Sequence, residues 1–322
     1  MKTRKLTLSL ILACGSIAAA LAVFLLVDGN PDLVPVNIIP DHGYITQEDY
    51  WHYIDRQGFD HPDPASLFEK GLVNKHTLPF FFFLNETYRG LGAAEQSEAV
   101  RAHMQLILAT PEKAQRMFEL YRAHEEYRKE LMGNHDRWFS RLAPGEMIAS
   151  LRDLQKFRRV RFGREAADAL FGVEVKSLEY TIRKHAIITG KRAGGIEKEK
   201  RLTRLRLEMW GDQSETIDSR LTPAQRCEEK INIYENDFAD LGEKERLDRI
   251  RGIRLEFFPP EEVNRLEGAD RRSRNTRKKD RDYYRRSRPI LDARDLTETE
   301  KNEKLMDLQN EIYGTPGGSG LR

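Results

Sequence analysis

Cysteine is almost absent from this chain of 322 residues, which contains only Cys14 and Cys227. Cys14 lies in an apolar N-terminal segment, so the rest of the chain has no second cysteine with which Cys227 could form an intrachain disulfide. The chain also lacks an excess of charge of one sign, because 54 Lys and Arg residues stand against 52 Asp and Glu residues. Proteins that bind phosphate backbones have a clear basic excess, so this balance argues against nucleic acid as a partner.

The short motifs that carry common enzyme chemistry are missing as well. The sequence contains no glycine-rich phosphate loop, no Cys-x-x-Cys pair, no His-Glu-x-x-His and no Gly-x-Ser-x-Gly. Its eight histidines are spread along the chain and do not cluster as metal ligands do. We therefore predict a protein that is not an enzyme, has no metal site and needs no cofactor.

One long apolar run is present, from Leu6 to Val27, and it contains no charged residue. A helix rises about 1.5 Å per residue, so a helix of this length roughly matches the hydrocarbon core of a bilayer. Basic residues precede the run and acidic residues follow it, namely Lys2, Arg4, Lys5 and Asp28. By the positive-inside rule this pattern predicts a single-pass inner-membrane anchor with a cytoplasmic N-terminus and an exported body.

Two alternatives to the anchor remain open at the level of sequence. The small residues of Ala18-Ala19-Ala20 are those that a signal peptidase prefers, although the apolar run continues beyond them to Val27. Ile11-Leu12-Ala13-Cys14 loosely resembles the lipobox of a lipoprotein, but Leu12 is too large for it. The length of the apolar run favours the uncleaved anchor.

Residues 28–44 contain prolines and glycine without a helical period, which predicts a spacer between the membrane and the body. From Thr46 onward the chain shows helical segments and very little strand signal, so the predicted fold class is all-α. Helix starts are predicted near Thr46, Ala65, Thr77, Ala94, Pro111, Gly145, Arg164, Ile196, Thr222, Glu243, Pro260 and Thr297. Thr222-Pro223-Ala224-Gln225 and Thr297-Glu298-Thr299-Glu300 give the clearest capping patterns.

Apolar spacing differs between the helical segments. Residues 94–131 carry apolar side chains at helical intervals and are expected to close a small compact core. Between about 195 and 255 the apolar residues are sparse among dense charges, and no apolar heptad is sustained as in a coiled coil. This second region is predicted to form an extended, arm-like array of solvated helices. A glycine-rich tail, Gly314 to Gly320, is predicted to be disordered.

Four consecutive phenylalanines and a leucine, from Phe80 to Leu84, form the most apolar stretch outside the anchor. On a helix they point around more than half of the circumference, which is too wide to bury wholly in a small subdomain. All four rings could still be core residues, as phenylalanines usually are. The alternative is that one or two of them contact a partner.

Three features together resemble the bacterial lipase-specific foldases, or lipase chaperones. They are the anchor with its spacer, the segment from Arg164 to Gly172 with the charged helices after it, and the segment from Phe258 to Leu266 that leads to Tyr283-Tyr284-Arg285 and Leu296-Thr297-Glu298-Thr299-Glu300. The signature of that family, Arg-x-x-Phe-Asp-Tyr-(Phe or Cys)-Leu-Ser-Ala-x-Gly-Glu, has its nearest match at Thr77 to Glu86.

The match keeps some residues of the signature and changes others. Phe80, Phe83 and Leu84 agree with it and Phe82 keeps an aromatic, whereas Thr77, Phe81 and Asn85 stand where the family has Arg, Asp and Ser. The lost charged pair implies either weaker foldase competence or a divergent client. The resemblance places the partner-binding residues at Phe80, Phe81, Phe82, Phe83, Leu84 and Asn85.

The resemblance also implies an organisation and a role. The cytoplasmic tip and anchor would span residues 1–27 and the spacer 28–44, followed by a helical subdomain over 45–140, an extended arm over 141–255 and a second subdomain with its tail over 256–322. Such a protein would be a periplasmic steric chaperone, tethered to the inner membrane, that helps a secreted lipase over its last folding barrier. A non-enzymatic envelope scaffold built of charged helices is the alternative from another class.

Overall fold

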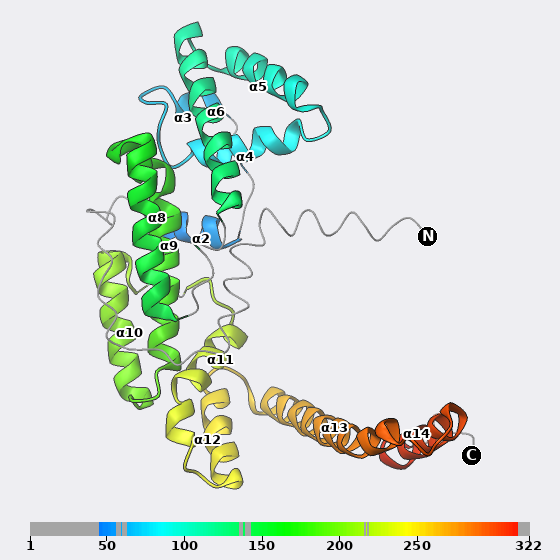
Figure 1. The fold of residues 1–322 in the computed structure, drawn as a ribbon. Coiled ribbons are helices and arrows are strands. Elements are labelled where there is room, and N and C mark those ends of the chain that lie inside the picture. The colour runs from blue at the N-terminus through cyan, green and yellow to red at the C-terminus, as the bar shows by residue number, and fades with distance from the viewer. Residues whose placement is uncertain are drawn as a thin grey trace. The chain divides into compact units, whose positions relative to one another are not determined.

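The computed structural model describes residues 45–55, 59, 63–134, 138, 143–215, 217 and 219–314. Every regular element among these residues is helical (Figure 1). The helices are α2 Gln47–Asp55, α3 Pro64–Leu67, α4 Thr77–Thr87, α5 Ala93–Ile107, α6 Pro111–Gly133, α8 Pro144–Phe162, α9 Arg164–Thr189, α10 Gly195–Trp210, η3 Gly211–Gln213, α11 Pro223–Ile233, η4 Glu235–Phe238, α12 Glu243–Leu255, α13 Pro260–Asp292 and α14 Glu298–Tyr313. The predicted all-α class is confirmed over the described ranges.

The predicted anchor, Leu6 to Val27, and the spacer after it lie outside the described residues, as does most of the glycine-rich tail. None of the helices in the described part of the chain is both long and apolar enough to cross a bilayer.

Local signals, either a side-chain cap or a proline in the first turn, mark several of the helix starts. All twelve predicted starts fall within one residue of an observed one. At the start of α14 the predicted capping box is present, because Glu300 N–H donates to Thr297 Oγ1 at 3.3 Å and Thr297 N–H donates to Glu300 Oε2 at 2.8 Å. Thr110 caps α6 in a similar way, with its hydroxyl accepting from Lys113 N–H at 3.2 Å and Pro111 in the first turn.

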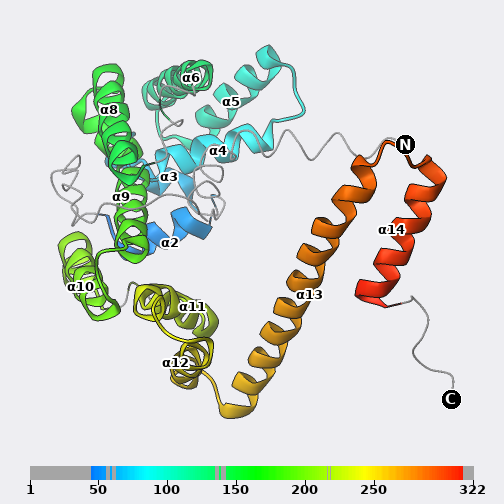
Figure 2. The ribbon, with the colours of Figure 1, turned by 60° about the horizontal axis from the view of Figure 1, so that its bottom comes forward.

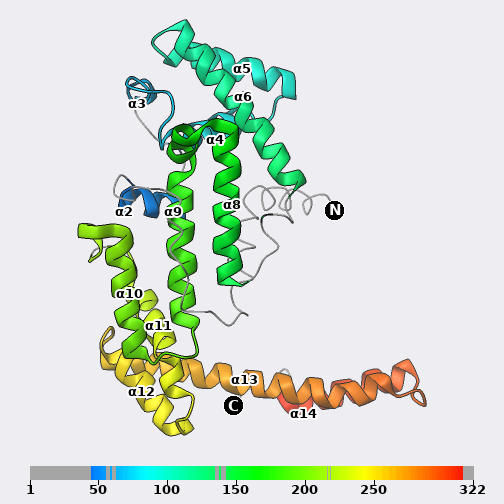
Figure 3. The same ribbon diagram turned by 60° about the vertical axis from the view of Figure 1, so that its left-hand side comes forward.

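The chain divides into two compact units. Unit 1 comprises Met1–Thr222 and Glu228–Leu241, and unit 2 comprises Pro223–Cys227 and Gly242–Arg322. In unit 1 the long helices α8 and α9 pack side by side (Figure 3). One continuous apolar core joins them to α4, α5 and α6, with fully buried members that include Phe80, Phe81, Val100, Met117, Phe118, Ile148, Leu170 and Phe171.

This core extends past the subdomain boundary that we predicted at residue 140. Ile148 on α8 and Phe171 on α9 share one cluster with Phe81 and Met117 from the predicted first subdomain. The two compact units instead separate between residues 222 and 242. Tyr127 on α6 packs 5.4 Å from Phe171 on α9 between ring centroids, and such contacts remove the apolar faces of these helices from water.

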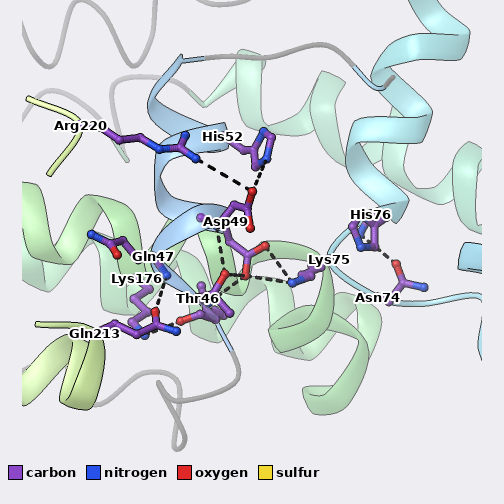
Figure 4. A network of polar contacts seen from close by, with 12 residues as sticks. Thr46, Gln47, Asp49, His52, Asn74, Lys75, His76, Lys176, Gln213 and Arg220 are labelled. Carbon is purple, nitrogen blue, oxygen red and sulfur yellow. Dashed lines mark hydrogen bonds and ion pairs between the residues drawn. The ribbon is translucent and has the colours of Figure 1, made fainter. Parts of the chain in front are cut away.

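A second, aromatic cluster lies in unit 1 where α2 meets α9 and α10. Tyr50 on α2 makes edge contacts with Tyr180 at 5.5 Å and with Trp210 at 5.3 Å between ring centroids. The buried Lys176 lies over the Trp210 ring at 4.2 Å and donates from Nζ to the Ile45 carbonyl at 2.8 Å. Figure 4 shows the polar side of this junction, where Asp49 pairs with Lys75 at 2.8 Å. These contacts hold α2 against α9 and α10 of unit 1.

Unit 2 is poor in apolar contacts. Helices α13 and α14 pair as a hairpin (Figure 2), but only Val263, Ser287 and Leu308 are buried within these two helices. Ion pairs supply much of the remaining contact, including Arg251 with Glu267 and Arg254 with Asp270, each at 2.6 Å. Helices α12 and α13 accordingly keep most of their circumference exposed; the sequence predicted this for α12, which lies in the charged segment between about 195 and 255.

Candidate partner-binding site on helix α4

Helix α4 is fixed at its N-terminus by a local hydrogen-bond network. The Thr77 hydroxyl donates to the Leu72 carbonyl at 3.0 Å and accepts from Asn74 N–H at 3.0 Å. The Asn74 side chain in turn accepts from His76 N–H at 2.8 Å, as Figure 4 shows, and donates to the Leu67 carbonyl at 2.9 Å. Thr77 is fully buried, and its bonds hold the turn that orients the aromatic residues after it.

The aromatic run of α4 divides between core and surface. Phe80, Phe81 and Leu84 are fully buried, and Phe83 is half-buried. Phe82 is 48% exposed. One turn of the helix therefore presents a single ring to solvent, while its neighbours hold α4 against the rest of unit 1.

Asn85 lies one turn beyond Phe82 and is held by three hydrogen bonds. Its side-chain carbonyl accepts from the Tyr121 hydroxyl at 2.6 Å and from Gln96 Nε2 at 3.2 Å. Its amide donates to Glu125 Oε1 at 2.9 Å. Arg128 pairs with Glu125 at 3.1 Å, and its guanidinium carbon lies 5.9 Å from the centroid of the Phe82 ring.

We call Phe82, Asn85, Glu125 and Arg128 the Phe82 surface. Tyr121, Glu125 and Arg128 occupy positions i, i+4 and i+7 of α6 and so share one helical face, which the sequence alone could show. What the sequence could not show is that this face meets Asn85, because the two segments are 36 to 43 positions apart. The aromatic ring thus stands beside a fixed carboxylate and a guanidinium.

The electrostatics of the Phe82 surface centre on Glu125. Burial by itself raises the pKa of this carboxyl, but His124, Asn85 and Arg128 around it lower the pKa to about 2. Burial lowers the pKa of the neighbouring His124, whose Nδ1 lies 3.6 Å from Glu125 Oε1. Burial and the Glu125 charge raise the pKa of Tyr121 to about 12. At neutral pH the surface therefore carries one carboxylate and one guanidinium in fixed positions.

This arrangement predicts an acid-sensitive contribution to the stability of unit 1. The pKa of Glu125 is lower in the folded state than the value of about 4.3 for an unfolded glutamate. Its contribution to the free energy of unfolding is therefore complete above pH 4.3 or so and is lost as the pH falls toward 2. Urea unfolding of the parent chain and of Glu125→Gln between pH 2 and 6 measures this contribution. If the free energy of unfolding had the same pH dependence in the two proteins, the prediction would be contradicted.

Across the ranges that the structure describes, no three residues of the His, Cys, Asp and Glu types come together in a way that could hold a metal ion. The arrangement places one exposed ring beside a polar network held by hydrogen bonds.

Comparison with known proteins assigns the chain to a class. The family model described as "Proteobacterial lipase chaperone protein" matches residues 140–316. The match spans more than half of the chain, which therefore belongs to the proteobacterial lipase chaperone family. The resemblance seen in the sequence is confirmed, and the family is one of chaperones. Neither the curated proteins nor the solved structures yielded a match to the chain.

The matched range begins after α6, so it does not include the Phe82 surface or the rest of the run from Phe80 to Asn85. The assignment of partner-binding residues to that run therefore stays a prediction. The structure narrows the set of residues that could contact a partner. Three of the six predicted residues are in the core, and only Phe82 exposes a large side chain.

Proposed function

We propose that this chain is a membrane-anchored periplasmic steric chaperone, which binds a folding intermediate of a secreted lipase and assists its conversion to the active, secretion-competent enzyme. The observation that carries the proposal is the family match over residues 140–316. The apolar run from Leu6 to Val27, with basic residues before it, supports the tether.

The proposed mechanism is kinetic. A compact, near-native lipase intermediate faces a high barrier to its final packing. A template lowers that barrier only if it binds the barrier state more tightly than it binds the intermediate. Helices such as α12 and α13, which bury one and two side chains respectively, leave long surfaces for a broad contact. A broad contact without many deep hot spots can hold a client and still release it.

The Phe82 surface is the proposed contact of unit 1 with the client. Exposed aromatic residues beside arginine are enriched among the residues that dominate protein interfaces. Here the ring is already oriented, since Phe81 and Leu84 anchor α4 in the core. Binding would therefore cost little side-chain ordering at this position.

The test is reactivation of a secreted lipase, the neighbouring or closest available one, diluted from denaturant in the presence of the full chain in nanodiscs. Ester hydrolysis is the readout, and empty nanodiscs are the control. We expect active lipase to appear in proportion to added chaperone, with a plateau near one chaperone per lipase. A stable, helical chain that binds the lipase but restores no activity would contradict the proposal; a chain that binds only itself would favour an envelope scaffold.

Phe82→Ala tests the role of the surface itself. We expect the dissociation constant for the lipase to rise about tenfold or more, as for a central aromatic hot spot. Helix content and the urea midpoint should stay close to those of the parent chain, because the side chain is half exposed. Leu106→Ala is the matched control, since Leu106 is 86% exposed on α5 of the same unit. Equal lipase binding by the two variants would remove Phe82 from the interface.

A further inference from the structure

We propose that a row of basic side chains along α13 binds anionic phospholipid headgroups of the membrane to which the chain is tethered. The proposal goes beyond lipase folding, although it rests on the proposed tether. It concerns residues within unit 2 alone.

The charge of α13 departs sharply from that of the whole chain. Residues 271–288 contain ten Lys or Arg residues and two Asp residues, although the chain as a whole has a formal net charge of only +2. Acidic residues outside this segment, including those of α14, produce the overall balance. A local excess of this size creates a positive field of its own.

The basic residues form a row on one side of the helix. Arg274, Lys278, Arg281, Arg285 and Arg288 follow one another at alternating intervals of four and three residues, which keeps them on one helical face. At about 1.5 Å of rise per residue the row is roughly 21 Å long. All five side chains are exposed.

The row lies away from the contacts between α13 and α14. Asp280 accepts from the Tyr313 hydroxyl at 2.6 Å, and Arg286 pairs with Glu311 at 2.6 Å. Ser287, between them in the helical projection, is buried. Figure 2 shows α14 alongside the C-terminal part of α13, so the other side of α13 is free of α14.

Little of the charge in the row is neutralised within the structure. Arg285 pairs with Asp282, and Arg288 lies 3.8 Å from Asp292 with a side chain that is 84% exposed. Arg274, Lys278 and Arg281 form no ion pair with any residue that the structure describes. Three consecutive members of the row therefore keep their full charge for an external anion.

A membrane surface suits this row better than a protein surface does. Arginine is enriched in protein interfaces, but the buried centre of such an interface is built around apolar or aromatic side chains, which the row itself lacks. A lipid leaflet offers many equivalent phosphates, and each Lys or Arg near such a surface adds to the attraction. The exposed Tyr284 beside the row is of the aromatic type that favours the membrane interface.

The test is hydrogen exchange of the full chain in nanodiscs, made either of phosphatidylcholine alone or with phosphatidylglycerol added. Because α13 buries so few side chains, its backbone should open readily unless it is docked. We expect exchange over residues 271–288 to slow about tenfold with the anionic lipid and to recover at high salt. No lipase is present, so the result does not depend on chaperone activity.

Charge reversal with a matched control identifies the row. Arg274→Glu, Lys278→Glu and Arg281→Glu combined should abolish the slowing. The control variant combines Lys244→Glu, Arg246→Glu and Arg249→Glu on α12, where the three residues are also exposed. It changes the net charge by the same amount and should keep the slow exchange. Exchange that is the same in both kinds of nanodisc would overturn the proposal. The proposal would also be overturned if exchange over residues 271–288 slowed only when lipase was added to neutral nanodiscs. That result would assign the row to binding of the client.

Discussion

Phe81→Asp is expected to destabilise unit 1 by about 5 kcal/mol or more, which is enough to unfold many domains. Phe82→Asp, at the next position, is expected to change the free energy of unfolding by less than about 1 kcal/mol. The difference follows from burial, because Phe81 is 0% exposed and Phe82 is 48% exposed. The two substitutions are chemically identical and occupy the same helix, so each controls for the other.

The surroundings of Phe81 explain why a carboxylate is not tolerated there. Its ring packs at 5.4 Å from Tyr121 and 5.6 Å from His124, between ring centroids. His124 could neutralise an aspartate only by binding a proton, and burial lowers the pKa of His124. The loss should therefore shrink as the pH falls, since protonation of either group removes an unpaired charge. Urea unfolding of both variants at pH 7 and pH 5 measures this; equal stability of the variants at pH 7 would show that α4 is not packed in this way.

The same positions explain how this chain departs from the foldase signature. The signature has Arg and Asp where Thr77 and Phe81 stand, one helical turn apart. Thr77 uses its hydroxyl within the preceding turn, and Phe81 fills the core between α4 and α6. At these two positions this chain therefore has local hydrogen bonding and apolar packing instead of a charged pair.

Helix starts could be predicted from the sequence because they depend on neighbouring residues. Thr297 and Glu300 form a capping box that involves only one turn, and Pro111 needs only its own fixed φ angle to begin a helix. The width of the Phe80 to Phe83 run on a helical wheel left two readings open, with all four rings in the core or with one or two of them facing a partner. The structure decides between them, because Phe82 is exposed.

Tertiary relationships could not be predicted in this way. The partners of Asn85 on α6 and the joint core of α6, α8 and α9 depend on which apolar faces meet, and a helical period carries no information about the partner of a face. For the same reason the charged character of α10 to α12 could be predicted, but the point where the two units divide could not.

Arg158 is expected to be the most important polar side chain between α6, α8 and α9. It is buried, donates from Nε to the Tyr127 hydroxyl and from Nη2 to Glu174, each at 2.8 Å, and lies 4.1 Å from the centroid of the Phe171 ring. Burial by itself lowers the pKa of Arg158, but Glu174 and Tyr127 raise it above the ordinary value. Arg158→Ala should therefore cost about 3–5 kcal/mol, as is usual when one partner of a buried ion pair is removed.

The cost should depend on the charge left behind as well as on lost packing. Arg158→Met keeps most of the volume, and adding Glu174→Gln removes the stranded carboxylate, so the double variant should recover part of the stability. Arg159→Met is the comparison, because the bidentate pair of Arg159 with Asp168 is more exposed than that of Arg158 and its loss is expected to cost less. Equal losses in Arg158→Met and Arg159→Met would mean that burial of Arg158 carries no special weight. Tyr127 lies on α6, before the range matched by the family model, and Glu174 lies within that range. Arg158 therefore joins α6, which carries Glu125 and Arg128 of the Phe82 surface, to the family-matched helices. Lipase reactivation should fall together with stability in Arg158→Ala.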